Sequence, residues 1–317
     1  MAIIKNNRTG EIVYLNTQHT FGRNRNIANT YLSGQDISQS HALISWRGSD
    51  WYLQDYSRNG TLVNGEYINN TTIKLSKGNT IQFGEQETAL WKLVDVGSPS
   101  SYLRPINLNE EIIELNSCYA FPNEEKPEAL IYPEDDAWKI EKEGVATKLT
   151  HNNIYTINNK EYTFVENNVL EDTMDNGHIV NNAYYQFTLS SDEEHIHIKI
   201  ITQNQAVDLG ERVHNYMLLA LARKKLDDAQ NELVDADQGW MTIDDLLEDM
   251  SKEFRKELDV YYLNLKIYRL RKLLIETKPY GYLFSNIIER RSGEIRFAHP
   301  FFKIIKEEAC IGEVLAS

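Results

Sequence analysis

Hydrophobic and polar residues alternate over short stretches in the first 95 residues of this 317-residue chain. Turn-forming residues separate the stretches, and this pattern is typical of an all-β sandwich. The apolar positions expected to face the core of the sandwich are Leu53, Ile81, Phe83, Leu90 and Leu93. Gly97 to Pro99, followed by two serines, predicts a boundary, so the first domain is expected to span residues 1–97.

The last third of the chain changes to a mixed pattern, with strict alternation first and helical spacing afterwards. Its predicted strands lie at residues 185–189 and 195–200 and near Val207, and its predicted helices at 211–225, from Thr242, and at 259–276. Thr242 begins Thr-x-x-Asp245, which is similar to a capping box. Two short strands around Ser292-Gly293 predict a hairpin over residues 286–298. An α+β domain is therefore expected over residues 185–299, with a C-terminal tail at 300–317.

Candidate chemistry gathers in the first domain, where donors for a phosphate group occur close to turns. Arg23 offers a planar guanidinium, Ser38 a hydroxyl, and Gln39 and Asn59 side-chain amides. Glycine follows Asn59 and Asn64, and Asn-Gly predicts tight type I′ hairpins. Loops held by a stiff sheet are therefore expected to present a phosphate-binding group of residues.

This stretch resembles the forkhead-associated (FHA) domain, a β-sandwich that binds phosphothreonine peptides. The resemblance is carried by Gly22-Arg23, Ser38-x-x-His41, Ser57-x-Asn59-Gly60 and Asn64-Gly65. It implies that Arg23 and Ser38 hold the phosphate, that Asn59 fixes the peptide main chain, and that His41 braces the loops without touching the ligand.

Two positions depart from the family pattern, and both change the expected field at the phosphate. Gln39 stands where many members have a basic residue, whereas Arg58 stands where a small hydroxyl residue is common. The resemblance gives Gly22, Gly60 and Asn64 structural roles. The alternative is a silent site, because one Arg and two Asn-Gly turns also occur in ordinary hairpins.

An internal repeat follows the first domain. Residues 9–24 align without gaps on residues 109–124, and the Ala-Leu-Ile before Trp51 recurs at the same interval before Trp138. The loops that carry the phosphate-binding residues are shortened in the second copy. Residues 102–166 are therefore expected to form a smaller, degenerate FHA-like sandwich, with an unrelated small β domain as the alternative. A linker is predicted at 167–184, where Thr173 is a candidate phosphoacceptor for Arg23.

Charge is unevenly distributed along the chain, which has a net charge of −14. Residues 96–185 carry 6 basic and 16 acidic side chains, whereas residues 260–306 carry 10 basic and 3 acidic ones, a net +7. The two cysteines, Cys118 and Cys310, form neither a disulfide framework nor a metal pattern. No apolar run is long enough for a membrane span and the first residues do not resemble a signal peptide, so we expect a cytoplasmic protein.

The basic segment and its surroundings resemble the winged-helix DNA-binding domain of response regulators. The most specific part is Leu263-x-x-x-Ile267-x-Arg269-Leu270-Arg271-Lys272-Leu273, followed by the predicted hairpin. The resemblance implies that the last helix enters the major groove and that the hairpin tip lies near the minor groove. The residues implied in DNA binding are Lys266, Arg269, Arg271, Lys272, Arg290 and Arg291. Such cations neutralise phosphates and release counterions.

No enzyme is expected, because the sequence has no nucleophile with a nearby base, no phosphate-binding glycine loop that opens a helix, and no metal or cofactor motif. The sequence predicts a multidomain, phosphothreonine-dependent transcriptional regulator. Its expected partners are duplex DNA and a phosphothreonine-containing protein, such as a Ser/Thr kinase or a kinase substrate, and a homodimer is left open. The alternative is a signalling adaptor or scaffold whose winged helix docks protein.

Overall fold

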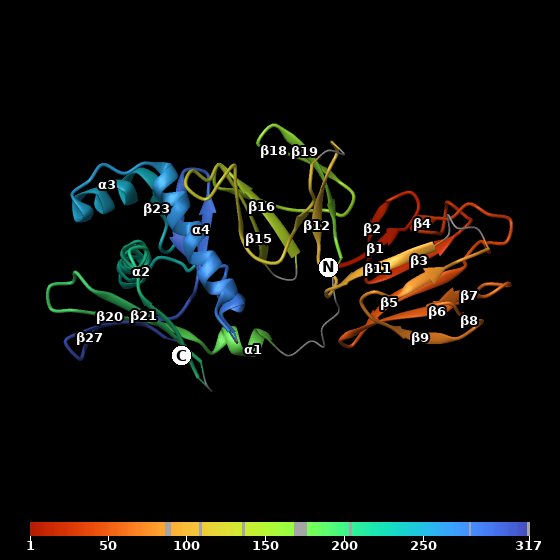
Figure 1. Ribbon diagram of the computed structural model, residues 1–317. Helices are drawn as coiled ribbons and strands as arrows, with labels where there is room; N and C mark the ends of the chain where they lie inside the picture. The colour runs from red at the N-terminus through yellow and green to blue at the C-terminus, as the bar shows by residue number, and fades with distance from the viewer. Residues whose placement is uncertain are drawn as a thin grey trace. The chain divides into compact units, whose positions relative to one another are not determined.

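The computed structural model describes residues 1–85, 90–107, 110–134, 137–167, 176–202, 205–278 and 280–315 (Figure 1). The chain forms two compact units. Unit 1 contains residues 1–116 and 163–171, and unit 2 contains residues 117–162 and 172–317. The residues of the predicted second sandwich, 102–166, are thus divided between the two units. None of the helices in the described ranges has the length and apolar character that crossing a membrane requires.

Unit 1 is built mainly from two β-sheets. The first has the strand order β2-β1-β11-β10-β7-β8. Its strands are β1 (Ala2–Asn6), β2 (Ile12–Tyr14), β7 (Thr61–Val63), β8 (Glu66–Ile68), β10 (Thr80–Gln82) and β11 (Leu90–Val96). The second has the order β4-β3-β5-β6-β9. Its strands are β3 (Gln18–Gly22), β4 (Thr30–Tyr31), β5 (Ala42–Arg47), β6 (Asp50–Asp55) and β9 (Thr72–Leu75).

The core of unit 1 lies between these sheets, because alternate residues of strands from both contribute to one apolar cluster. Phe21 of β3 stacks on Phe83 with ring centroids 4.7 Å apart and meets the edge of Trp91 of β11. Four of the five predicted core residues are fully buried. Leu90, at the start of β11, is only partly buried. The alternation therefore located the sandwich core correctly except at one strand end.

The chain between the first sandwich and the C-terminal helices is also made of strands. They are β12 (Tyr102–Pro105), β13 (Ile113–Glu114), β14 (Tyr119–Phe121), β15 (Ala129–Glu134), β16 (Ala137–Lys142), β17 (Val145–Lys148), β18 (Ile154–Ile157) and β19 (Lys160–Val165). β12 pairs with β13 in unit 1. In unit 2 the sheet order is β14-β15-β16-β17. β19 crosses the boundary at which the chain returns to unit 1.

The sheet β14–β17 repeats the pairing of β3, β5, β6 and β9 at the residues that the sequence aligns. Phe21 pairs with Ala42, and Phe121 pairs with Ala129. In the next pair of strands, Ile44 pairs with Leu53 and Ile131 with Ile140. Since a slip of one residue would turn every side chain to the other face, this agreement supports the alignment of the two copies. The FHA-like identity of residues 102–166 stays a prediction.

The C-terminal part of unit 2 contains a five-stranded sheet with the order β22-β21-β20-β26-β27. Its strands are β20 (Tyr184–Leu189), β21 (Ile196–Ile201), β22 (Ala206–Glu211), β26 (Phe302–Lys306) and β27 (Ala309–Val314). The prediction of a C-terminal tail at 300–317 is therefore wrong for most of these residues. β26 pairs in parallel with β20, and Phe302 and Ile304 enter the core, so burial of apolar side chains holds this segment in the sheet.

The predicted linker at 167–184 is more ordered than expected at both ends. The side-chain oxygen of Asn167 accepts the Thr17 N–H at 2.6 Å, and its amide donates to the Leu15 carbonyl. α1 (Asn176–Asn181) precedes β20, and Ala183 is buried. Residues 168–175, and with them the candidate phosphoacceptor Thr173, lie outside the described residues.

The remaining elements of unit 2 are three helices and a hairpin close to the predicted positions, together with a 3₁₀ helix and a two-residue strand that were not predicted. They are α2 (Asn215–Gln230), α3 (Ile243–Phe254), α4 (Val260–Glu276), the 3₁₀ helix η2 (Gly281–Phe284), and the sheet of β23 (Met241–Thr242), β25 (Glu294–Phe297) and β24 (Ile288–Arg291). Thr242 caps α3 by accepting the Asp245 N–H, and Asp259 caps α4 by accepting the Tyr262 N–H.

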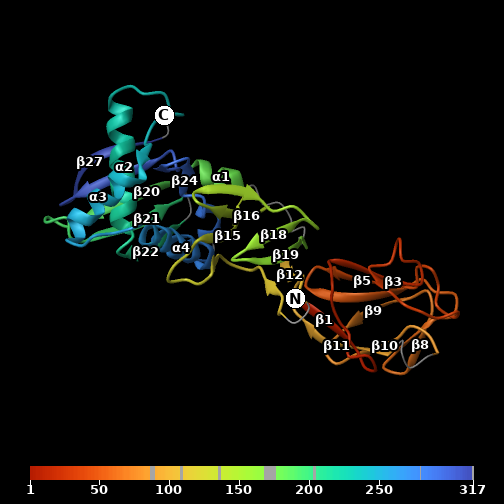
Figure 2. The same ribbon diagram turned by 90° about the horizontal axis from the view of Figure 1, so that it is seen from above.

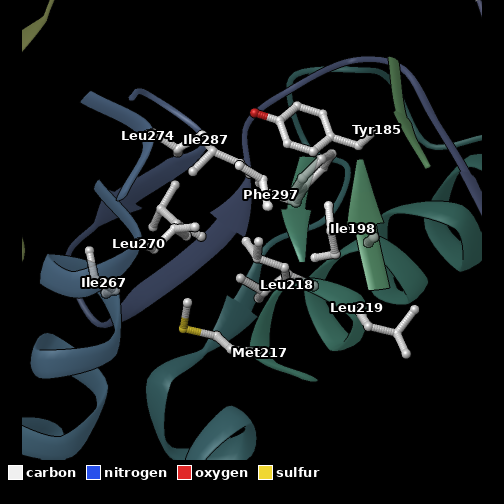
Figure 3. Close-up of a cluster of buried hydrophobic side chains, with 14 of the residues drawn as sticks. Tyr185, Ile198, Met217, Leu218, Leu219, Ile267, Leu270, Leu274, Ile287 and Phe297 are labelled. Atoms are coloured by element: carbon white, nitrogen blue, oxygen red, sulfur yellow. The ribbon is translucent and has the colours of Figure 1, made fainter. Parts of the chain in front are cut away.

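One apolar core joins these helices to the sheets of unit 2. Figure 3 shows Met217 and Leu218 of α2, Ile267, Leu270 and Leu274 of α4, and Phe297 of β25 gathered around the inner face of β20 and β21. Buried residues of the β14–β17 segment, Cys118, Leu130 and Tyr132, belong to the same cluster. α4 runs beside β15 and β16 in both Figure 1 and Figure 2. The sheet β14–β17 therefore packs as part of the C-terminal body.

Candidate functional site

Three loops of unit 1 bring the predicted phosphate-binding residues together. The loop after β3 carries Arg23, the loop before β5 carries Ser38 and Gln39, and the loop after β6 carries Arg58 and Asn59. The Arg23 N–H donates to the Ser38 carbonyl at 3.0 Å, and the Asn24 N–H donates to the Gln39 carbonyl at 3.2 Å. These backbone bonds fix the first two loops against each other.

Ser38 also connects the second loop to the third. Its Oγ accepts the backbone N–H of Arg58 at 3.0 Å, which leaves the hydroxyl proton to be donated. No described residue accepts that proton. The side chains of Arg23 and Arg58 are exposed, and neither guanidinium has a partner among the described residues. The loops thus present two guanidinium groups and one hydroxyl donor to solvent, which are the groups that bind phosphate oxygens.

Behind these donors lies a buried network that the sequence analysis found only in part. His41 is fully buried; its Nδ1 accepts the Ser38 N–H at 3.2 Å and its Nε2 lies 3.2 Å from Thr61 Oγ1. Thr61 and Ser57 both donate to Oδ1 of buried Asp55, at 2.7 and 2.8 Å. Burial lowers the pKa of His41, which favours the neutral ring that the Ser38 bond requires. His41 therefore braces the Ser38 loop.

Asn59 uses its side-chain N–H within the protein and keeps its side-chain oxygen available to a ligand. Its Nδ2 donates to the Asp36 carbonyl at 2.9 Å, and Oδ2 of Asp36 accepts the Glu85 N–H. This leaves the amide oxygen of Asn59 as the group that could meet a peptide N–H. Asp36 and Asp55 were missed from the sequence, although each stands a few residues before a motif residue.

The two Asn-Gly turns differ from each other, and one prediction about them is wrong. Asn64 and Gly65 both have positive φ, 52° and 84°, as a type I′ turn requires. At the first turn only Gly60 has positive φ, because its N–H is held by Ser57 Oγ and Asn59 is held by Asp36. Gly60 has a φ of 81°, which favours glycine, and a Cβ there would also come within 2.2 Å of the Tyr67 ring, which would have to move. Gly22 is restricted in the same way, since a Cβ there would lie 2.2 Å from the Gln39 carbonyl oxygen.

Comparison with protein families matches residues 19–84 to the FHA domain. The match spans β3 through the end of β10 and contains all three loops. The N-terminal part of this chain carries an FHA domain. FHA domains bind phosphothreonine peptides in signalling. Comparison with curated proteins gave no match.

Solved structures, several of them FHA domains, are similar to about 30% of this chain. The FHA domain of the CT664 protein from Chlamydia trachomatis is 27% identical, with 30% of this chain and 96% of that chain covered and a TM-score of 0.27. The N-terminal FHA domain of Rad53p from S. cerevisiae, in complex with a phosphothreonine peptide, is 25% identical, with 29% and 90% covered and a TM-score of 0.27. Mycobacterium tuberculosis EmbR, in complex with a low-affinity phosphopeptide, is 21% identical, with 31% and 25% covered and a TM-score of 0.27.

In unit 2, two of the residues predicted to contact DNA are instead buried against the β14–β17 sheet. The Arg271 side chain is 2% exposed and the Arg290 side chain 5% exposed. Each binds one oxygen of Glu141, at 2.8 and 3.0 Å, and the Arg271 guanidinium lies 3.9 Å from the centroid of the Tyr132 ring. Burial by itself would raise the pKa of Glu141. The two guanidinium groups lower the pKa by more than burial raises it, so it lies below its ordinary value. The prediction that Arg271 and Arg290 lie on an exposed, DNA-facing surface is therefore wrong, because both side chains are buried and paired with Glu141.

The other predicted cations are in more varied surroundings. Lys272 pairs with Glu124 at 2.9 Å, and Lys266 is largely buried with its amine 4.5 Å from the centroid of the Tyr262 ring. Arg291 lies over the Trp240 ring and pairs with Glu294. Arg269 is exposed, and no described residue binds its guanidinium. Of the six predicted cations, Arg269 is thus the one that the fold leaves unengaged.

Proposed function

We propose that this chain is a signalling protein whose FHA domain binds a phosphothreonine-containing partner, such as a Ser/Thr kinase or a kinase substrate. The observation that carries the proposal is the arrangement of Arg23, Ser38 and Arg58. The backbone N–H groups of Arg23 and Arg58 both donate to Ser38, to its carbonyl and its Oγ respectively. Both guanidinium groups and the Ser38 hydroxyl proton are left without acceptors among the described residues. Preorganised donors of this kind bind a phosphate without first giving up internal bonds.

Binding of the full chain to a degenerate phosphothreonine peptide library, compared with the same library without phosphate, tests this proposal. Arg23→Ala should weaken binding about tenfold or more, because hydrogen bonds to charged groups contribute about 1.5–3 kcal/mol. The matched control is Arg47→Ala. Arg47 ends β5 at the strand end away from His41, where it binds Ser45 and Gln54. Equal retention of both libraries, or equal losses in the two variants, would contradict phosphate recognition at this site.

A second activity, duplex DNA binding by the C-terminal part of unit 2, completes the proposed function as a phosphothreonine-dependent transcriptional regulator. Two features favour it. The order of α2, α3, α4 and the β24–β25 hairpin agrees with the winged-helix pattern, and residues 260–306 carry a net charge of +7 in an acidic chain. Exposed Arg269 lies on α4 in this basic segment.

Retention of the full chain on a random-sequence duplex, measured over a range of salt, tests the second activity. Each phosphate contact contributes about 0.9 to the slope of log affinity against log salt. Arg269→Ala should lower the affinity and the slope, whereas Lys199→Ala should not, because Lys199 lies on β21 and pairs with Asp208. The absence of salt-sensitive retention would favour the adaptor alternative, in which the C-terminal part docks protein.

A further inference from the structure

The basic face of α4 and the hairpin strand β24 is already occupied by a segment of the same chain. The occupant is the sheet β14–β17, which we call the cover. Residues 119–148, which contain this sheet, carry 8 acidic and 4 basic side chains, a net −4, opposite the +7 of residues 260–306. Both segments belong to unit 2.

At the centre of this contact one carboxylate binds two arginines from different elements. Glu141 of β16 accepts from Arg271 of α4 through Oε2 and from Arg290 of β24 through Oε1, and all three side chains are at most 5% exposed. Tyr132 donates to the same carboxylate at 3.2 Å, and Asn264 accepts from Arg290 at 2.8 Å. Guanidinium groups bind carboxylate and phosphate oxygens in the same way, so Glu141 occupies the place that a DNA phosphate would take.

Around the centre, polar contacts continue along the same face of α4. Lys272 and Tyr268 both bind Glu124, and the Asn264 amide donates to the Pro127 carbonyl. At the end of β15, the Ser285 hydroxyl donates to the Pro133 carbonyl. The cover therefore engages three of the six cations predicted to bind DNA. It buries Arg271 and Arg290, which no duplex could reach while the cover is in place, and it pairs the partly exposed Lys272 with Glu124.

We propose that the β14–β17 sheet is an autoinhibitory cover, which holds DNA affinity low by occupying Arg271, Lys272 and Arg290 until it is displaced. This inference rests on the proposed DNA-binding activity. DNA can displace the cover only to the extent that it binds the uncovered state more tightly. The segment that contains the cover is joined to unit 1 at both ends, because the chain passes from unit 1 into unit 2 after Asn116 and returns to unit 1 at Thr163. A phosphopeptide signal from unit 1 therefore has a direct chain connection to it.

The test is Glu141→Gln in the full chain, with Glu128→Gln as the matched control. Both changes remove one negative charge from the cover, but Glu128 is exposed and its side chain has no partner among the described residues. Loss of the Glu141 charge leaves two buried arginines without a counter-ion, which should release the cover. Glu124→Gln is the second variant, since Glu124 is 61% exposed and its loss leaves no charge buried.

Two readouts separate opening of the cover from DNA binding. Labelling of Cys118, in a Cys310→Ser background, reports opening, because Cys118 is 3% exposed and belongs to the apolar cluster that joins the cover to α4. Affinity for a random-sequence duplex, and its salt slope, reports the freed cations. We expect Glu141→Gln to label faster, to bind at least about tenfold more tightly, and to steepen the slope by up to about 2.7, at about 0.9 for each of three new phosphate contacts. Glu124→Gln should change both readouts in the same direction by less.

Three other outcomes would contradict the autoinhibitory role of the cover. Faster labelling without any gain in DNA affinity would overturn the inference together with the proposed DNA-binding activity, since the freed arginines would then bind no duplex. Wild-type affinity already equal to that of Glu141→Gln would overturn the inference alone and leave DNA binding standing. Unchanged labelling in both variants, with wild-type circular dichroism, would show that the carboxylates do not hold the cover.

Discussion

Buried His19 makes a pH-dependent contribution to the stability of the FHA domain. The side chain is 4% exposed; its Nδ1 accepts the Asn16 N–H at 3.3 Å and its Nε2 lies 2.8 Å from Thr30 Oγ1. Burial, reinforced by the positive charge of Arg104, lowers its pKa from 6.5 to about 4. A second proton would have to enter at Nδ1, where it would break the Asn16 bond and place a charge inside the sandwich.

The direction in which stability changes with pH depends on whether the folded or the unfolded chain binds the proton more tightly. The unfolded chain takes up a proton on His19 below the ordinary pKa of 6.5, whereas the folded chain does so only near 4. The stabilisation is therefore fully present above pH 6.5 and is lost as the pH falls from 6.5 towards 4. The shift corresponds to about 3 kcal/mol in all, lost at about 1.4 kcal/mol per pH unit.

Native-state hydrogen exchange of the β5 and β6 amides, corrected for intrinsic exchange, measures this loss, and NMR titration of the imidazole measures the pKa directly. His19→Gln should remove most of the slope between pH 6.5 and 4. His195→Gln is the control, because His195 is exposed and lies in unit 2. A His19 resonance that titrates near the ordinary value of 6.5 would contradict the lowered pKa. An unchanged dependence of stability on pH in His19→Gln would show that another group causes it.

Three further predictions concern other parts of the chain. Gly22→Ala should lower the stability of unit 1 by about 1–3 kcal/mol in thermal unfolding and weaken phosphopeptide binding, because its Cβ would lie 2.2 Å from the Gln39 carbonyl oxygen; equal stability would show that the loop can move aside. Cys118, whose pKa burial raises to about 12, should resist alkylation in the native chain at mildly alkaline pH while exposed Cys310 reacts, so that one thiol is labelled before denaturation and two after it. Thr242→Ala should destabilise unit 2 by about 1 kcal/mol in urea unfolding, since α3 loses its cap, whereas Thr242→Ser should retain most of that stability.

The meeting of the loops that carry Arg23, Ser38 and Asn59 could be predicted from the sequence because its determinants are local. Gly22 is required because a side chain there would collide with the neighbouring backbone, and Gly60 because its φ is positive. Ser38 and His41 act across three residues of one loop. Such constraints fix residue types at short, readable spacings. The hydrogen bonds from Ser57 and Thr61 to Asp55 were not predicted, because nothing in the sequence distinguishes a carboxylate that becomes buried at a strand end from an exposed one.

The sequence also determined the caps and the hydrophobic faces of the helices, since each depends on residues a few positions apart. Tertiary structure alone decided what happens to the charged side chains and to the chain end. Arg271 and Arg290 look like surface cations, but the fold brings Glu141, more than one hundred residues earlier, between them and buries all three. β26 likewise joins the core by pairing with β20, which lies more than one hundred residues before it. Contacts between distant segments leave no periodic trace in the sequence, because pairing and charge neutralisation depend on which surfaces meet after folding.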